Sequence, residues 1–245
     1  MVVMKPVVVI PVFNHEHAIA AVVEQVKAHG LPVLLVDDGS KPSCATVLDA
    51  LAQQPGVSLF RRTENGGKGA AVMSGLHEAK RLGFTHAVQI DADGQHALGD
   101  LPTFLAQATA HPDALITGVP QYDDSVPKGR LYGRYLTHVW VWINTLSLAI
   151  KDSMCGFRVY PLERTLRALV PSIGKRMDFD PEIAVRLVWG GAEVVNLPTH
   201  VTYPTDGVSH FDVLWDNVRI SGMHTRLFFG MLLRLPKLLW RKVAR

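Results

Sequence analysis

Cysteine is scarce in this chain: Cys44 and Cys155 are its two occurrences, and no C-x-x-C pair is present. This scarcity argues against a disulfide scaffold and against a cysteine-ligated zinc site, and it fits a protein of the reducing cytoplasm. Charged residues make up 19% of the chain and hydrophobic residues 48%. A chain of 245 residues with this balance can bury a substantial core, so we expect one large α/β domain or two small ones.

A general excess of basic residues is also absent. The formal net charge is +3, but six basic residues and no acidic one lie between Arg226 and Arg245. The rest of the chain is therefore slightly acidic, and we expect no nucleic-acid partner.

Two glycine signatures of nucleotide-binding proteins are missing. No G-x-G-x-x-G follows the first expected strand, which excludes a dinucleotide fingerprint. Residues 64–69, E-N-G-G-K-G, contain a lysine outside the G-x-x-x-x-G-K-[ST] spacing, which excludes a P-loop.

Long uninterrupted apolar runs are absent as well. Residues 1–11 lack the apolar region and the small-residue cleavage site of a signal peptide, so we interpret them as leading into the first strand. Residues 131–150 are mainly apolar and carry two tryptophans, but Arg134, His138 and Asn144 interrupt them. This pattern favours a buried or interfacial helix over a membrane span.

What the chain does have is a regular alternation of expected strands and helices. Apolar runs indicate buried strands at 7–12, 33–36, 57–60 and 84–90. Helices are expected at 17–29, 43–54 and 70–82, the second of them capped by Ser43. Short β-α repeats of this kind predict an α/β fold with a doubly wound, mostly parallel sheet flanked by helices.

The second half of the chain is less regular. We expect helices at 98–110, 131–150 and 181–189, with Asp180 as a candidate N-cap of the last. Short strands are expected at 114–118 and 192–197 and before Tyr160, and the polar loop 121–129 is a candidate lid. Residues 210–240 have the pattern of amphipathic helices whose apolar and cationic faces suit an anionic membrane surface. The alternative for this tail is a helix that packs on its own domain or on a second copy.

Two carboxylates stand at the end of the fourth expected strand. Asp91 and Asp93 directly follow the apolar residues 88–90, and Gly94 and Gln95 come next. Two carboxylates one residue apart repel each other, and in a turn both can face one divalent cation. The alternative is a polar turn that caps the strand.

Other polar residues follow the first three strands. In a parallel sheet the segments after these strands open on one edge, so side chains far apart in the sequence can converge there. The residues that we expect at this edge are Asn14, Asp37, Asp38, Lys68, Asp91 and Asp93. Together they predict a nucleotide crevice.

The chain resembles the family-2 glycosyltransferases of GT-A-type fold, most closely their dolichyl- and polyprenyl-phosphate sugar synthase branch. The matching pieces are I-P-V-F-N at 10–14, V-D-D-G-S at 36–40, N-G-G-K-G-A at 65–70, D-A-D-G-Q-H at 91–96, residues 152–158, and D-G-V-S at 206–209. Their order and spacing carry the resemblance. It implies an inverting transferase that moves a sugar from a nucleoside-diphosphate sugar to a lipid-linked acceptor, either a polyprenyl phosphate or a lipid hydroxyl.

The resemblance also implies roles for single residues. The nucleoside pocket would be lined by Pro11, Asn14, Asp37 and Asp38, with Ala92 nearby. Asp91, Asp93 and Gln95 would hold Mg²⁺ or Mn²⁺ on the donor diphosphate, with Asp93 also catalytic. Lys68 and Arg130 or Arg134 would lie near phosphates.

The implied organisation is a GT-A-type domain at 1–208 and an amphipathic tail at 209–245. The protein would be cytoplasmic and peripherally associated with the inner face of the cell membrane. A homo-oligomer is compatible with this organisation. Three positions depart from the branch: His15 separates Asn14 from Glu16, Cys155 replaces a serine, and His210 replaces a basic residue. The last change leaves the acceptor headgroup open.

The need for a catalytic base depends on the acceptor. A phosphate acceptor is already anionic at neutral pH, whereas a hydroxyl must lose a proton during attack. Asp152 is the candidate base, and its alternative role is a loop carboxylate that orients Arg158 or caps a helix. His96 and His200 are candidates for an additional metal contact.

Rival functions remain open at this point. Residues 88–94 also resemble the nucleophile turn of haloacid-dehalogenase-like phosphatases, although that turn normally follows the first strand. A sugar-1-phosphate nucleotidyltransferase would need a glycine-rich loop after Val12, which is not seen. A non-catalytic, membrane-associated nucleotide-binding protein is the third alternative.

Overall fold

The computed structural model describes residues 3–121, 128–201 and 212–243, without the side chains of 128–132. A seven-stranded sheet has the order β3-β2-β1-β4-β6-β5-β7. Its strands are β1 (Pro6–Val12), β2 (Val33–Asp37), β3 (Val57–Arg61), β4 (His86–Gln89), β5 (Leu115–Gln121), β6 (Arg158–Pro161) and β7 (Val194–His200). Neighbouring strands are parallel except that β6 is antiparallel to both β4 and β5. The predicted doubly wound, mostly parallel sheet is confirmed.

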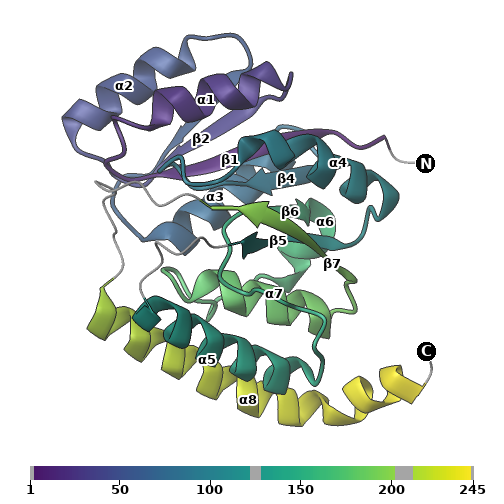
Figure 1. The fold of residues 1–245 in the computed structure, drawn as a ribbon. Helices are drawn as coiled ribbons and strands as arrows, with labels where there is room; N and C mark the ends of the chain where they lie inside the picture. The colour runs from purple at the N-terminus through teal and green to yellow at the C-terminus, as the bar shows by residue number, and fades with distance from the viewer. Residues whose placement is uncertain (1–2, 122–127, 202–211, 244–245) are drawn as a thin grey trace.

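Helices cover both faces of this sheet (Figure 1). They are α1 (Ile19–Ala28), α2 (Pro42–Ala52), α3 (Lys68–Arg81), α4 (Leu101–Ala110), α5 (Lys128–Thr145), α6 (Leu162–Ala168), α7 (Phe179–Trp189) and α8 (Val213–Val243), with a 3₁₀ turn at Leu98–Asp100. Alternate residues of β1 face opposite sides, because successive side chains of a strand do so. Val8 and Ile10 pack with α1, α2 and α4, whereas Val7 and Val9 pack with α3 and α7.

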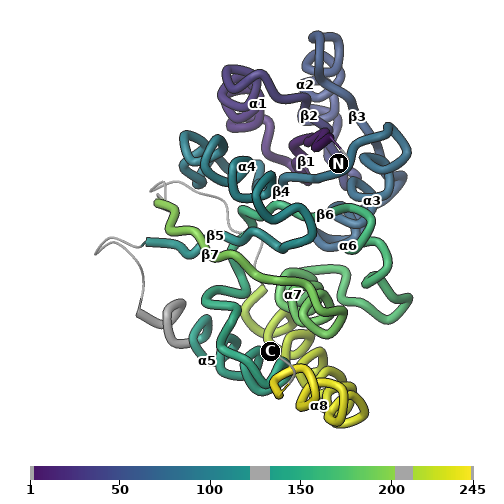
Figure 2. Tube along the Cα trace, turned by 90° about the vertical axis from the view of Figure 1, so that its right-hand side faces the viewer, coloured from purple at the N-terminus to yellow at the C-terminus, as the bar shows by residue number. Residues whose placement is uncertain are grey.

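The helices α5 and α8 form an outer layer beneath α7, side by side in both views (Figures 1 and 2). Buried residues of α8, such as Met223 and Leu227, belong to the same core cluster as Val7 and Val9. The tail is therefore one long helix packed on the body, where several helices were expected. The division at residue 208 stays a prediction. Within the described residues, no helix has the length and apolarity needed to cross a membrane.

Two predicted helix caps are wrong. The N-cap of α2 is Lys41, with Pro42 in the first helical position, where a missing N–H is harmless. Ser43 instead donates its hydroxyl to Glu16 at 3.1 Å. The N-cap of α7 is Asp178. Asp180 lies inside the first turn, and its carboxylate contacts Lys68.

Two further features differ from expectation. The short helix α6 was not predicted from the sequence. The candidate lid at 121–129 falls mainly on residues 122–127, which lie outside the described residues, while Gln121 ends β5 and residues 128–129 begin α5.

Candidate functional site

The carboxyl ends of β1 and β2 are tied together around Asn14. The Asp38 N–H donates to Val12 O at 2.9 Å. The Asn14 N–H donates to Ser40 Oγ at 3.2 Å, and Lys41 N–H donates to Asn14 Oδ1 at 2.8 Å. Asn14 has a φ of 56°, a left-handed conformation that asparagine tolerates better than most residues. Pro11 is buried and pairs with Val36 of β2, so it lies within the sheet beside the end of β2.

Asp37 and Asp38 are almost fully buried and heavily bonded. Asp37 accepts hydrogen bonds from Ser40 N–H at 2.9 Å and from Arg61 Nε at 2.8 Å. Asp38 accepts from Arg62 Nε at 2.7 Å and from the N–H groups of Gly66 and Gly67 at 3.0 and 2.8 Å. A buried carboxylate must be satisfied in this way. Asp38 therefore shapes the glycine turn that leads into Lys68.

The glycine at position 67 is required by its surroundings. Its φ is 94°, and an added Cβ would lie 2.8 Å from Lys175 O and 2.5 Å from Arg176 Cγ. The segment before α7 thus packs directly against the turn that begins α3.

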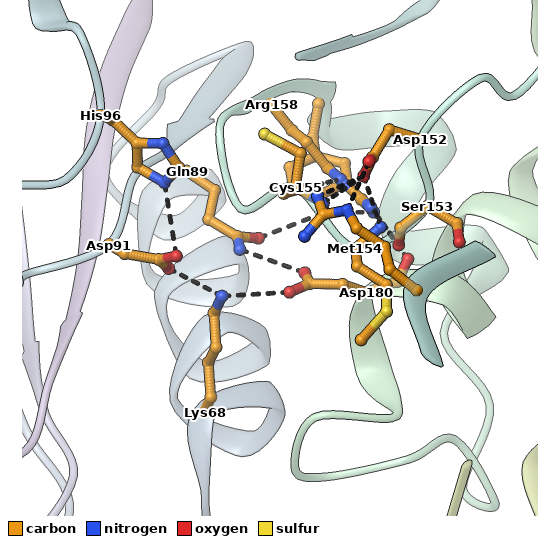
Figure 3. A network of polar contacts seen from close by, with 12 residues as sticks. Lys68, Gln89, Asp91, His96, Asp152, Ser153, Met154, Cys155, Arg158 and Asp180 are labelled. Carbon is orange, nitrogen blue, oxygen red and sulfur yellow. Dashed lines mark hydrogen bonds and ion pairs between the residues drawn. The ribbon is translucent and has the colours of Figure 1, made fainter. Parts of the chain in front are cut away.

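Lys68 connects the two halves of the site (Figure 3). Its ammonium Nζ lies 2.7 Å from Asp91 Oδ1 and 3.1 Å from Asp180 Oδ2. Burial alone would lower the pKa of Lys68, but Asp180 and Asp91 raise it above its ordinary value. Burial alone would likewise raise the pKa of Asp91, but Lys68 and His96 bring it well below its ordinary value. The lysine and Asp91 are therefore held as an ion pair.

Asp93 is in the opposite electrostatic situation. Burial and the negative charge of Asp91 raise its pKa, although Gln95 N–H donates to Asp93 Oδ1 at 3.1 Å. A divalent cation would relieve this excess negative charge, so the carboxylate set fits a metal ion. In the described part of the chain, no group of three or more histidine, cysteine, aspartate and glutamate side chains could hold a metal by itself. Carboxylate oxygens such as those of Asp91 and Asp93 suit Mg²⁺ or Mn²⁺, which are commonly shared with substrate phosphates and water.

Asp152 sits in a second polar cluster beside α5. Arg134 donates to it through Nε at 2.6 Å and Nη2 at 2.7 Å, and His138 Nε2 lies 3.3 Å away. The N–H groups of Met154 and Cys155 also donate to Asp152 Oδ1. Burial would raise the pKa of Asp152, but His138 and Arg134 hold it well below its ordinary value. A carboxylate so stabilised as an anion is a weak base.

Arg158 fastens this second cluster to the first (Figure 3). It is fully buried and donates to the carbonyl oxygens of Ser153, Cys155 and Asp180 at 2.6, 2.8 and 2.6 Å. A Cβ on Gly156 would lie 2.5 Å from Asp91 Oδ2. The 152–158 loop therefore packs directly against Asp91.

Comparisons with known proteins assign this chain to a family. Residues 7–166 match the model of glycosyl transferase family 2. The chain belongs to this family. The polyprenol monophosphomannose synthase of Mycolicibacterium smegmatis is 30% identical over 224 residues, covering 84% of this chain and 80% of the relative. The undecaprenyl-phosphate mannosyltransferase of Micrococcus luteus is 26% identical over 208 residues, covering 80% and 82%.

Solved structures confirm the GT-A-type fold of this glycosyltransferase. Mannosyl-3-phosphoglycerate synthase from Rubrobacter xylanophilus superposes with a TM-score of 0.64 at 17% identity, covering 96% of this chain and 75% of the other. Glucosyl-3-phosphoglycerate synthase from Mycobacterium tuberculosis, in complex with Mn²⁺, UDP-glucose and phosphoglyceric acid, gives 0.63 at 15%, covering 93% and 79%. These matches do not support the alternative functions, which were a phosphatase, a nucleotidyltransferase and a non-catalytic nucleotide-binding protein.

The transferase fold brings most predicted site residues to one edge. Ala92 is buried between the two aspartates, and His96 Nε2 lies 3.3 Å from Asp91 Oδ2. The His200 carbonyl accepts the Ala97 N–H at 3.2 Å, so the end of β7 reaches the same region. Arg130 lies in α5, but its side chain is outside the described residues.

Three residues of the site were missed. Gln89 Nε2 donates to Asp180 Oδ1 at 3.1 Å, and Tyr160 donates its hydroxyl to Gln89 Oε1 at 3.2 Å. Gln89 offered a signal, because a glutamine inside an apolar strand must find buried partners. Asp180 offered none, since an aspartate near a helix start is typical of a cap.

Proposed function

We propose that this glycosyltransferase moves a sugar from a nucleoside-diphosphate sugar to the phosphate of a polyprenyl-type lipid, with inversion at the anomeric carbon. The observation that carries the donor half of the proposal is the acidic pair at the end of β4. Asp91 is neutralised by Lys68, while burial and the negative charge of Asp91 raise the pKa of Asp93. This imbalance suits a divalent cation on a diphosphate.

Each residue then has a specific task toward the donor. Asp91 and Asp93 would hold Mg²⁺ or Mn²⁺, with Gln95 as a further oxygen ligand, and the bound cation would stabilise the charge on the leaving diphosphate. Asn14 and Asp37 keep the β1 and β2 ends in place for the nucleoside. Asp38 holds the Gly66–Gly67 turn, which orients Lys68.

The state of Asp152 supports a phosphate acceptor over a hydroxyl. A hydroxyl would need a base, yet Asp152 is bonded to Arg134, His138 and two backbone N–H groups. A phosphate oxygen attacks without losing a proton, so this ion pair would instead maintain the shape of the acceptor side. Relatives named for polyprenol or undecaprenyl phosphate support the same choice.

The outer faces of α5 and α8 support contact with the cytoplasmic surface of a membrane. On α5, Leu136, Trp140 and Ile143 are exposed on the face opposite Arg134 and His138. The exposed apolar residues of α8 recur at helical spacing and include Leu214, Trp215, Val218, Phe229, Leu233 and Trp240. Basic residues flank the second half of this stripe, as expected for a helix lying on an anionic leaflet. We propose a peripheral association through this face.

The test is a transfer assay with the purified full chain. Labelled nucleoside-diphosphate sugars are offered with undecaprenyl phosphate or with the free alcohol undecaprenol, each with Mn²⁺, with Mg²⁺ or with EDTA. We expect metal-dependent glycolipid from the phosphate and little from the alcohol. Equal transfer to both acceptors would contradict the assigned acceptor, and full transfer in EDTA would contradict the metal site.

A further inference from the structure

Asp180 is a buried carboxylate with no role in capping its own helix. It is 5% exposed and lies in the first turn of α7, while Asp178 occupies the N-cap position. Its two oxygens are used on other elements: Oδ2 lies 3.1 Å from Lys68 Nζ, and Oδ1 accepts from Gln89 Nε2 at 3.1 Å. Its carbonyl also accepts from Arg158 Nη1 at 2.6 Å. Asp180 is thus fixed in place by β4 and β6.

The consequence concerns the lysine between the two carboxylates. We propose that Asp180 is a positioning residue: it holds the ammonium of Lys68 and so keeps Asp91 available to the divalent cation of the donor complex. The proposal rests on the proposed function, because it presupposes a cation at Asp91 and Asp93.

Charge balance gives the physical reason. Counted over the side chains of Lys68, Asp91, Asp93 and Asp180, three carboxylates oppose one ammonium and leave a formal charge of −2, while the Arg158 guanidinium contacts the carbonyl oxygen of Asp180. Without the charge of Asp180, Lys68 would have Asp91 as its single carboxylate partner among the described residues. The lysine would then compete with the metal for that oxygen and repel the metal at short range.

Asp180→Asn removes the charge and keeps the size of the side chain. We expect it to weaken binding of Mn²⁺ alone by about 10- to 100-fold, the range typical of residues that support metal ligands. The readout is the electron paramagnetic resonance signal of free Mn²⁺ titrated against protein, without substrate. Asp178→Asn is the matched control: it changes a buried carboxylate two residues away that accepts from Arg176 N–H and has no contact with Lys68 in the described residues. We expect its Mn²⁺ affinity to stay within about twofold.

A double variant separates charge balance from a merely structural role. Lys68→Gln combined with Asp180→Asn removes one charge of each sign and restores two formal negative charges, so Mn²⁺ binding should return to within about threefold of the wild type. Loss in the double variant equal to that in Asp180→Asn would overturn the proposal. Unchanged Mn²⁺ binding by Asp180→Asn would overturn it as well.

If Asp180→Asn alone fails to fold, the double variant still tests the proposal, because it has no lysine at position 68. Near-wild-type Mn²⁺ affinity would then support the proposal, and loss in a folded double variant would overturn it. Absence of Mn²⁺ binding by the wild type would overturn this inference, whereas full sugar transfer in EDTA would overturn the proposed function. Unchanged Mn²⁺ binding by Asp180→Asn, or an equal loss in the double variant, would refute the inference alone.

Discussion

The cluster around Asp91 and the cluster around Asp152, which are the proposed donor and acceptor sides, differ in how their carboxylates are neutralised. On the donor side, Asp91 shares Lys68 with Asp180, and Asp93 is left with a raised pKa. On the acceptor side, Asp152 is matched by Arg134 and His138, and its pKa is lowered. The carboxylates at the end of β4 thus outnumber the cationic side chain that contacts them. The carboxylate of Asp152, in the neighbouring loop, is instead matched by Arg134. This difference supports the proposed roles, in which Asp93 would bind the donor complex and Asp152 would maintain structure.

The largest expected effect follows from removing the unbalanced carboxylate. Asp93→Ala should lower metal-dependent sugar transfer by at least about 10²–10³-fold, since it deletes a group that stabilises charge in the transition state. Initial rates at saturating Mn²⁺ measure this loss. A residual rate within tenfold of the wild type would contradict the role of Asp93.

The next effect tests whether Asp152 acts as a base. Because Asp152 is stabilised as an anion by Arg134 and His138, Asp152→Asn should lower transfer to undecaprenyl phosphate much less than Asp93→Ala does. Initial rates with undecaprenyl phosphate at saturating Mn²⁺ measure this loss. A loss of about 10²-fold or more in a folded variant would indicate a base and contradict the structural role.

Stability should respond to the same substitution in a pH-dependent way. Because the folded-state pKa of Asp152 is lowered, its contribution is complete above the ordinary aspartate pKa of about 4 and is lost as pH falls below it. Asp152→Asn removes the buried anion that Arg134 and His138 contact, which costs about 1–3 kcal/mol at pH 7. Chemical denaturation at pH 7 and pH 3 should show a smaller difference between variant and wild type at pH 3. A difference independent of pH would contradict the ion-pair role.

A smaller effect tests the contact between the two sides. Gly156→Ala places a methyl group 2.5 Å from Asp91 Oδ2 and should destabilise the fold by about 1–3 kcal/mol, with weaker Mn²⁺ binding. Gly99→Ala is the control, because its added Cβ meets nothing within 4 Å. Equal stability and equal Mn²⁺ affinity in both variants would show that the loop is free to move away from Asp91.

The smallest expected effect concerns the outer face of α8. Leu233→Glu should weaken binding to vesicles of anionic lipid by about tenfold, since it removes an apolar contact and adds repulsion. Val3→Glu, at a similarly exposed apolar residue near the N-terminus, should leave binding unchanged. Vesicle flotation measures both, and equal loss in the two variants would contradict a docking face on α8.

The fold and half of the site could be predicted from local pattern. β-Branched runs marked the buried strands, and the order of strands and helices placed Asn14, Lys68 and Asp91 at one edge. The antiparallel direction of β6 could not be predicted, because the short sequence R-V-Y-P is compatible with both parallel and antiparallel pairing. Several helices were expected in the tail, yet α8 continues through Pro236 as one helix.

The partners of the buried carboxylates also escaped prediction. Arg134 reaches Asp152 because α5 packs beside the 152–158 loop, and Asp180 reaches Lys68 because α7 begins against the start of α3. Both contacts depend on how helices pack, which residue spacing does not encode. Sequence therefore identified the carboxylates but not which of them are neutralised.

Isothermal titration of a nucleoside diphosphate with and without Mn²⁺ tests the central claim most directly, because it needs neither the acceptor nor the membrane. UDP and GDP are titrated into the wild-type chain and into Asp93→Ala. We predict that Mn²⁺ strengthens binding of at least one diphosphate by tenfold or more (about 1.4 kcal/mol) in the wild type and not in the variant. Binding of both diphosphates that is equally tight with and without Mn²⁺ would contradict a cation site at the end of β4.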